Sequence, residues 1–227
     1  MQRFFDVVFS SIALISLLPL FLSLIFILRL TGEGEIFFLQ NRVGLRGKNF
    51  KLYKFATMLK DSPNIGTGTV TVKDDRRVLP IGRFLRKTKI NELPQLINIL
   101  KGDMSVIGPR PQTQRCFDAF PSKMQNEIIK VRPGLSGIGS VVFRSEEEMM
   151  YEDVEPNQLY DDVIMPYKGK LESWYVNNQS VWNYFVIIIL TILIIFTNST
   201  RIVFYCFSSL PRPPKNLKSY IYSDFYV

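Results

Sequence analysis

The chain has 227 residues, of which 47% are hydrophobic, and it carries a formal net charge of +8 with a pI of about 9.5. This length suits one domain with a core, or a small domain with membrane segments, and a basic, apolar-rich chain indicates anionic partners such as lipid head groups, nucleotides or nucleic acid. The sequence contains no histidine, which excludes Ser-His and Cys-His nucleophile pairs and histidine-ligated zinc. The two cysteines, Cys116 and Cys206, are far apart, so neither a disulfide framework nor a cysteine metal site is predicted. Any acid–base or nucleophilic chemistry must therefore come from carboxylates, lysine, tyrosine or a bound metal.

Residues 4–30 form an almost wholly apolar run near the N-terminus. The run is long enough to span a bilayer as a helix, since about 20 apolar residues suffice. Pro19 lies near its middle and removes a backbone donor, so a bend at Leu18 and Pro19 is predicted. Basic residues flank the run on both sides, and positive charge favours the cytoplasmic side of a membrane. Two alternatives follow from this pattern: a kinked helix that crosses the membrane, or a re-entrant helix that enters, bends and returns.

The middle of the chain alternates segments that favour strands and segments that favour helices. The stretches "IFFLQ" (36–40) and "GKNFKLYKFATM" (47–58) are rich in β-prone residues. Helical spacing marks residues 91–102, 117–131 and 168–182. The predicted fold class is therefore α+β, a small domain of helices with short strands.

The C-terminal part begins with the apolar run "YFVIIILTILIIF" (184–196), which is short for a membrane-spanning helix. The polar stretch 197–201 separates it from a second apolar run, so an interfacial or re-entrant hairpin is favoured over a crossing. We therefore expect three parts: a membrane helix over 1–31, a central domain over 32–182, and an apolar membrane-associated segment with its tail over 183–227.

Asn91 and Glu92 stand at the start of the helix predicted in "KTKINELPQLINILKG" (87–102). Asn91 is a preferred N-cap residue, the carboxylate of Glu92 complements the helix dipole, and Gly102 is a common residue after a helix end. Ordinary capping explains the pair on this evidence alone. The surrounding basic residues indicate an anion site, however, and a lone carboxylate there can hold Mg²⁺ against substrate phosphates.

These residues also carry a resemblance to a known family. The chain resembles the bacterial sugar transferases over the stretch 87–111, "KTKINELPQLINILKGDMSVIGPRP", and over 37–58, 77–89, 131–137 and 174–182. This family consists of monotopic polyprenol-phosphate phosphoglycosyl transferases, also described as undecaprenyl-phosphate glycosyl-1-phosphate transferases. The resemblance implies a re-entrant N-terminal helix bent at a proline, and a transferase domain on the cytosolic face of the bacterial inner membrane. The implied reaction moves a sugar-1-phosphate from a UDP-sugar to a polyprenol phosphate, with Mg²⁺ and release of UMP, as the first membrane step of surface polysaccharide synthesis.

Position 91 departs from the family pattern, which has an Asp-Glu pair there. The family aspartate attacks the β-phosphate and becomes a phosphosugar-enzyme while the glutamate works with Mg²⁺; by position, Asn91 replaces the aspartate and Glu92 matches the glutamate. Because a carboxamide is a poor nucleophile, three alternatives stay open. Glu92 attacks the β-phosphate, with Asp103 or substrate phosphates helping to hold the metal, or the polyprenol phosphate attacks it directly without a covalent intermediate. In the third alternative, the protein has lost catalysis. An active transferase is favoured, since the basic and lipid-side residues are otherwise complete. The phosphate-binding residues that the resemblance implies are Lys54, Arg77, Arg86, Arg110 and Arg144.

The alternative function is a non-catalytic membrane adaptor that binds polyprenol phosphate or the glycan-assembly machinery. Nucleic acid is not an expected partner, because the aromatic residues lie in membrane-like runs and are not interleaved with the basic ones. The expected partners are a UDP-sugar, polyprenol phosphate and the membrane, and a homodimer is compatible with them.

Overall fold

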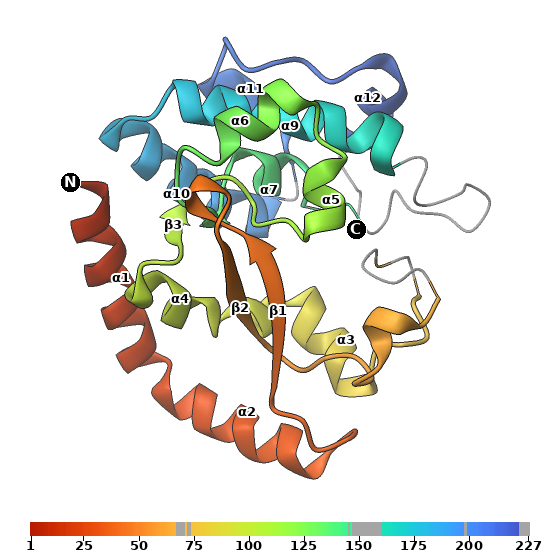
Figure 1. Ribbon diagram of the computed structural model, residues 1–227. Coiled ribbons are helices and arrows are strands. Elements are labelled where there is room, and N and C mark those ends of the chain that lie inside the picture. Colours follow the sequence, from red (N-terminus) through yellow and green to blue (C-terminus); the bar gives the residue numbers. More distant parts are fainter. Residues whose placement is uncertain (67–70, 72–73, 145, 147–159, 198, 223–227) are drawn as a thin grey trace.

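The computed structural model describes residues 1–227 except 67–70, 72–73, 145, 147–159, 198 and 223–227 (Figure 1). In the described part, helices surround two small two-stranded sheets, which confirms the predicted α+β class. The strands are β1 (Phe37–Val43), β2 (Asn49–Phe55), β3 (Ser105–Ile107) and β4 (Gly134–Ser136). The longer helices are α1 (Gln2–Ser16), α2 (Leu18–Leu30), α3 (Pro80–Lys87), α4 (Gln95–Lys101), α6 (Ser122–Ile128), α9 (Met165–Asn177), α10 (Val181–Thr197) and α12 (Lys215–Ile221). Shorter helical segments are η1 (Leu45–Gly47), η2 (Ser62–Asn64), η3 (Ile90–Glu92), α5 (Gln114–Asp118), α7 (Ile138–Val142), η5 (Tyr160–Ile164) and α11 (Arg201–Cys206).

The N-terminal apolar run forms two helices, α1 and α2, which meet at Leu17 and are bent by 62°. The break falls one residue before the predicted bend at Leu18 and Pro19. Pro19 therefore sits in the first turn of α2, where its missing N–H costs no helical hydrogen bond. None of the described helices is by itself long and apolar enough to cross a membrane; α1 and α2 reach that length and composition only as a bent pair.

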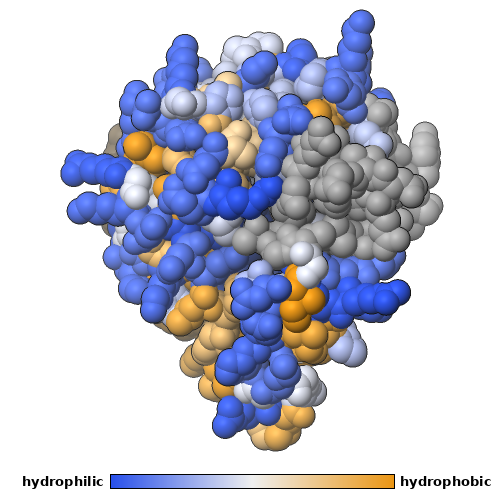
Figure 2. All heavy atoms as spheres, turned by 45° about the vertical axis from the view of Figure 1, so that its right-hand side comes forward, coloured by the Kyte–Doolittle hydropathy of each residue, from blue (hydrophilic) through white to orange (hydrophobic). Residues whose placement is uncertain are grey.

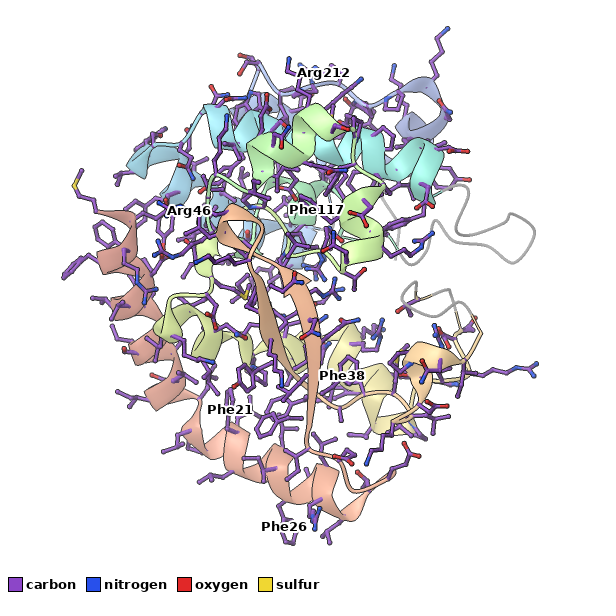
Figure 3. The ribbon with its side chains drawn as sticks, viewed as in Figure 1. Phe21, Phe26, Phe38, Arg46, Phe117 and Arg212 are labelled. Carbon is purple, nitrogen blue, oxygen red and sulfur yellow. The ribbon has the colours of Figure 1, made fainter. Side chains whose placement is uncertain are left out.

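Helix α2 covers the β1–β2 hairpin with one face and leaves the other face open. Phe21 packs against Phe55 of β2 with ring centroids 5.3 Å apart, and Leu85 of α3 joins the same buried cluster. Figure 3 shows Phe21 on the inner side of α2 and Phe26 on the opposite side, and the side chain of Phe26 is 65% exposed. The hairpin is antiparallel, with Phe37 opposite Phe55, so both strands predicted from the sequence are confirmed.

Helix α1 is tied to the rest of the molecule by a buried aspartate that the sequence pattern did not mark. Asp6 is 2% exposed, and its Oδ1 accepts hydrogen bonds from Ser105 Oγ at 2.9 Å, Val106 N at 2.9 Å and Tyr184 OH at 3.0 Å. Arg3, one turn earlier, donates to two backbone carbonyls in the last turn of α4. These contacts join α1 to β3, α10 and α4, so the helix pair is a fixed part of the fold.

The parallel pairing of β3 with β4 brings two chain segments very close together. Gly134 is opposite Ser105 in the register, and a Cβ on Gly134 would lie only 2.1 Å from the backbone N of Gly108. No residue other than glycine fits at this crossing. The crossing fixes the start of the loop that follows β3, which carries Arg110.

Two predicted helices are each divided in the structure. The stretch 117–131 is split between α5 and α6 at Pro121, which has no N–H to continue a helix. The stretch 168–182 is divided between α9, which ends at Asn177, and α10, which begins at Val181.

Helix α10 contains the C-terminal apolar run and contributes to the largest buried core cluster together with α7 and α9. Its other face is open, with exposed side chains at Trp182, Ile189, Ile192, Leu193, Ile195 and Phe196. Figure 2 shows hydrophobic residues gathered at the lower end of the molecule, where α2 lies in Figure 1, and mainly hydrophilic residues over the upper part. The domain boundaries at 31 and 182 stay predictions, and residues 223–227 of the predicted tail are outside the described part.

Candidate active site

A cavity of about 190 Å³ lies between the β1–β2 hairpin, the α3–η3 segment and α9. Five of the predicted site residues line it: Lys54 from β2, Arg86 from α3, Asn91 and Glu92 from η3, and Arg110 from the loop after β3. The structure thus brings together residues from four separate segments of the chain. Their catalytic and phosphate-binding roles stay predictions.

Arg77, Arg144 and Asp103, by contrast, are absent from the described lining of this cavity. Arg77 is 5% exposed, and its guanidinium is held by Asp75 at 2.5 Å and by two backbone carbonyls, an arrangement that stabilises the loop before α3. Arg144 is half-buried, and this burial lowers its pKa. Asp103 accepts a hydrogen bond from Asn98 at 3.2 Å, beyond the other end of α4.

Glu92 is held between two basic side chains. Its Oε1 lies 2.9 Å from Nη2 of Arg110 and 3.7 Å from Nζ of Lys54, and its side chain is 12% exposed. Burial opposes ionisation of this carboxyl group, but the charges of Arg110 and Lys54 outweigh burial and hold the pKa of Glu92 well below its usual range. The side chain is therefore a carboxylate at neutral pH.

The two basic partners respond in opposite directions. Burial lowers the pKa of Lys54 to about 7, although Glu92 opposes this change. The charge of Glu92 raises the pKa of Arg110 further above its ordinary value. Arg110 is thus a permanent cation in the cavity, whereas the charge on Lys54 depends on pH near neutrality. Strongly perturbed groups that share a cavity are typical of functional sites.

The backbone of Arg110 is positioned by a second buried carboxyl group. Oε1 of Glu172, on α9, accepts a hydrogen bond from the backbone N of Arg110 at 3.1 Å. Glu172 is 1% exposed, and burial raises its pKa to about 7. No local pattern in the sequence indicates that Glu172 contacts this loop, because Arg110 lies 62 positions away.

Asn91 does not cap the helix, which corrects the prediction made from its position. Helix α4 begins only at Gln95, after η3 and Pro94, and no side-chain cap is formed at either start. The side chain of Asn91 is buried instead, and its Oδ1 has no hydrogen-bond partner among the described residues. The predicted helix end is confirmed, since Gly102 has a left-handed conformation with φ of 90°.

Lys168 and Glu146 also line the cavity. Nζ of Lys168 is 2.7 Å from both carboxylate oxygens of Glu146 and lies over the rings of Phe143 and Tyr160. Lys168 and Glu172 are four residues apart and so share a face of α9, which is otherwise apolar there. Buried Lys and Glu on an apolar helix face are rare, and this pattern could have identified both from the sequence.

The described lining has six basic side chains and two carboxylates, Glu92 and Glu146. The basic residues are Arg42, Lys54, Arg86, Lys89, Arg110 and Lys168. Such an arrangement suits a ligand with several negative charges, such as a diphosphate. In the described residues, no group of three or more carboxylate, cysteine or histidine side chains could hold a metal by itself. Asn91 and Glu92 are consecutive residues that both line the cavity, and their amide and carboxylate oxygens are donors of the kind that suits Mg²⁺, which takes its remaining ligands from substrate phosphates and water.

Comparison with known proteins supports the resemblance found in the sequence. The model of the bacterial sugar transferase family matches residues 1–198. The UDP-N-acetylgalactosamine-undecaprenyl-phosphate N-acetylgalactosaminephosphotransferase of Aeromonas hydrophila is 36% identical over 200 residues, which cover 86% of this chain and 44% of that protein. The UDP-glucose:undecaprenyl-phosphate glucose-1-phosphate transferase of Klebsiella pneumoniae is 32% identical over 203 residues, covering 88% of this chain and 41% of that protein.

A shorter relative aligns over most of its own length. The exopolysaccharide production protein ExoY of Rhizobium meliloti is 30% identical over 205 residues, which cover 84% of this chain and 83% of that protein. The chain spans less than half the length of the Aeromonas and Klebsiella proteins. The family match over residues 1–198 confirms the resemblance, and the chain belongs to the bacterial sugar transferase family.

Proposed function

We propose that this protein transfers a sugar-1-phosphate from a UDP-sugar to a polyprenol phosphate and releases UMP, as the first membrane step in the synthesis of a bacterial surface polysaccharide. The observation that carries the proposal is the basic cavity around Glu92, which has the charge that a nucleotide diphosphate requires. Two of the relatives are named for the same class of reaction. These names do not favour the non-catalytic adaptor.

In this proposal Arg110, Arg86 and Lys54 bind the phosphates of the UDP-sugar. Arg110 is the strongest candidate, because a permanent guanidinium in a buried site forms short, directional hydrogen bonds to phosphate oxygens. Glu92 sets the position of Arg110 and Lys54 through its two ion pairs. Mutual repulsion between these cations is thereby reduced before the substrate enters.

The presence of asparagine at position 91 favours direct attack by the lipid phosphate. An oxygen of the polyprenol phosphate forms a bond to the β-phosphorus of the UDP-sugar, and the bond from that phosphorus to the bridging oxygen breaks, so that UMP leaves with the bridging oxygen. Glu146 is paired with Lys168, and Oε1 of Glu92 is engaged by two cations, so both described carboxylates in the cavity are weakened as nucleophiles. Asn91 contributes a neutral oxygen and no negative charge to repel the incoming phosphate.

Mg²⁺ is the metal that this site would accept, with Glu92 and Oδ1 of Asn91 as the protein ligands. When bound, it would neutralise charge on the diphosphate and on the leaving UMP.

The membrane part of the proposal concerns the bent pair α1–α2 and the open face of α10. We propose that α1 and α2 enter the cytosolic leaflet of the inner membrane as a re-entrant pair and return to the same side. Large apolar side chains are exposed along the outer side of both helices, including Phe4, Ile12, Leu22 and Phe26. The inner side is occupied by packing against the domain, so only the outer side is available to lipid.

The experiment is a UMP-release assay with a panel of UDP-sugars, run with and without polyprenol phosphate and Mg²⁺. Release that requires both, and that is lost in Glu92→Gln, is the expected result. Absence of release with every sugar, or unchanged turnover in Glu92→Gln, would overturn the proposed function.

Direct attack is tested in the same samples. Under direct attack, no UMP is released without the lipid acceptor, and no phosphosugar adduct is found on the protein by intact mass. A burst of UMP without acceptor would show a covalent intermediate instead. Asn91→Asp is the matched variant, because it restores a carboxylate at that position and is expected to allow such a burst.

A further inference from the structure

A second groove, of about 420 Å³, lies beside the N-terminal end of α1. Its basic side chains are Arg3 from α1, Arg46 from η1, and Lys130 and Arg132 from the segment between α6 and β4. We call these four residues and the space between them the basic groove. The described residues that line this groove are all different from those that line the cavity around Glu92.

The charge of the basic groove is strongly one-sided. Asp6 is its only acidic lining residue in the described part of the chain; this side chain is buried, and its Oδ1 accepts hydrogen bonds from Ser105, Val106 and Tyr184. Arg46 and Lys130 are exposed, so their charges are available to a ligand from solution or from a membrane surface.

Backbone contacts hold the basic residues in place. The guanidinium of Arg3 donates to the carbonyls at the end of α4, and Nε of Arg132 donates to the carbonyl of Gly102 at 2.8 Å. Arg46 lies in the hairpin turn with φ of 57°, and its backbone N donates to the carbonyl of Ile129 at 2.7 Å. Figure 3 shows Arg46 at the end of the hairpin, on the side of the molecule where α1 begins. Three separate segments therefore present their charges toward one space.

The apolar surface begins directly beside this groove. Phe4, next to Arg3, is 67% exposed, and Trp182 at the start of α10 is 76% exposed. The two helices are joined here by the contact of Phe5 with Phe185, whose ring centroids are 5.0 Å apart. A basic cluster bordered by exposed Phe and Trp is the pattern found where a protein meets lipid head groups.

We propose that the basic groove binds the phosphate of an anionic phospholipid in the membrane that α1 and α2 enter. The inference rests on the proposed membrane association, but it does not depend on the catalytic reaction. The groove lies at the N-terminal end of α1, where the proposed re-entrant pair would enter the membrane, so a phosphate bound there would hold this end of α1 at the depth of the lipid head groups.

The test uses the full chain and two kinds of vesicle, one of phosphatidylcholine alone and one that also contains phosphatidylglycerol. The variant is Arg46→Gly with Lys130→Gln; glycine suits the left-handed backbone at position 46, so the fold is retained. The control variant is Lys215→Gln with Lys218→Gln, which removes the same charge from α12, at the opposite side of the molecule in Figure 1.

Wild type and control are expected to bind phosphatidylglycerol vesicles roughly tenfold or more tightly than phosphatidylcholine vesicles, and the groove variant is expected to lose this preference. All three should release UMP at the same rate in detergent. The proposal is overturned if the groove variant keeps the preference, if the control loses it equally, or if calorimetry shows that inorganic phosphate alone binds the wild-type groove tightly. If wild type binds both kinds of vesicle equally, the proposed phospholipid site is overturned and the proposed membrane association stands. If wild type binds neither kind of vesicle, both proposals are overturned.

Discussion

Glu172→Gln is expected to change how the stability of the protein depends on pH. Glu172 is 1% exposed, its Oε1 accepts a hydrogen bond from the Arg110 N–H, and its Oε2 is buried with no hydrogen-bond partner in the described part of the chain. Burial raises its pKa from 4.5 to about 7. Between these two values the folded protein binds more protons at this site than the unfolded chain does. The contribution of Glu172 to stability is therefore complete below about pH 4.5 and is lost as the pH rises to about 7.

The size of this loss follows from the two pKa values. At about 1.4 kcal/mol for each unit of pKa, the free energy of unfolding should fall by about 3 kcal/mol relative to a protein that is neutral at this position. Glutamine is neutral at every pH and keeps an acceptor for the Arg110 N–H. The difference in unfolding free energy between Glu172→Gln and wild type should therefore move by about 3 kcal/mol in favour of the variant across this range. If the amide of the glutamine changes the unfolding free energy by an amount that does not depend on pH, this amount does not affect how the difference changes with pH.

Urea unfolding in detergent, followed by tryptophan fluorescence at several pH values, measures this difference. Asp162→Asn is the matched control, because Asp162 is exposed, and its difference from wild type should stay nearly constant. A difference for Glu172→Gln that does not change between about pH 4 and pH 8 would refute the reasoning. It would mean that Glu172 is already stabilised as a carboxylate in the folded protein.

Three further predictions concern the cavity and the packing around it. Because burial lowers the pKa of Lys54 to about 7, its positive charge is lost as the pH rises through that value. In steady-state kinetics, the KM for the UDP-sugar should therefore rise several-fold from about pH 6 to pH 8 in wild type and much less in Lys54→Arg. Asp6→Ala leaves three hydrogen-bond donors without their acceptor and should lower the free energy of unfolding by about 3 kcal/mol or more in urea unfolding, whereas Asp6→Asn, which keeps one acceptor oxygen, should cost less. Gly134→Ala places a methyl group 2.1 Å from the backbone N of Gly108, so a loss of about 1–3 kcal/mol in thermal unfolding and reduced UMP release are expected, and an unchanged melting temperature would contradict the close crossing.

The sequence by itself determined several local elements and identified five of the residues that line the cavity around Glu92. Alternation of apolar and basic residues was enough to predict strand β2, and Gly102 was enough to predict the end of α4, because both patterns act within a few residues. The pairing of β2 with β1 was seen only in the structure. The family resemblance identified Glu92 and Arg110 as members of one site, and the structure places them 2.9 Å apart.

Only the tertiary structure decided which residues converge on that site. Arg77 and Arg86 are equally basic in the sequence, yet Arg77 is held by Asp75 outside the cavity lining while Arg86 lines the cavity. The partners of the buried Asp6 and Glu172 could be seen only in the structure, because they belong to segments that are distant in the sequence. Whether a polar side chain is a cap, a buried anchor or a ligand depends on which segments surround it, and packing between distant parts of the chain determines those surroundings.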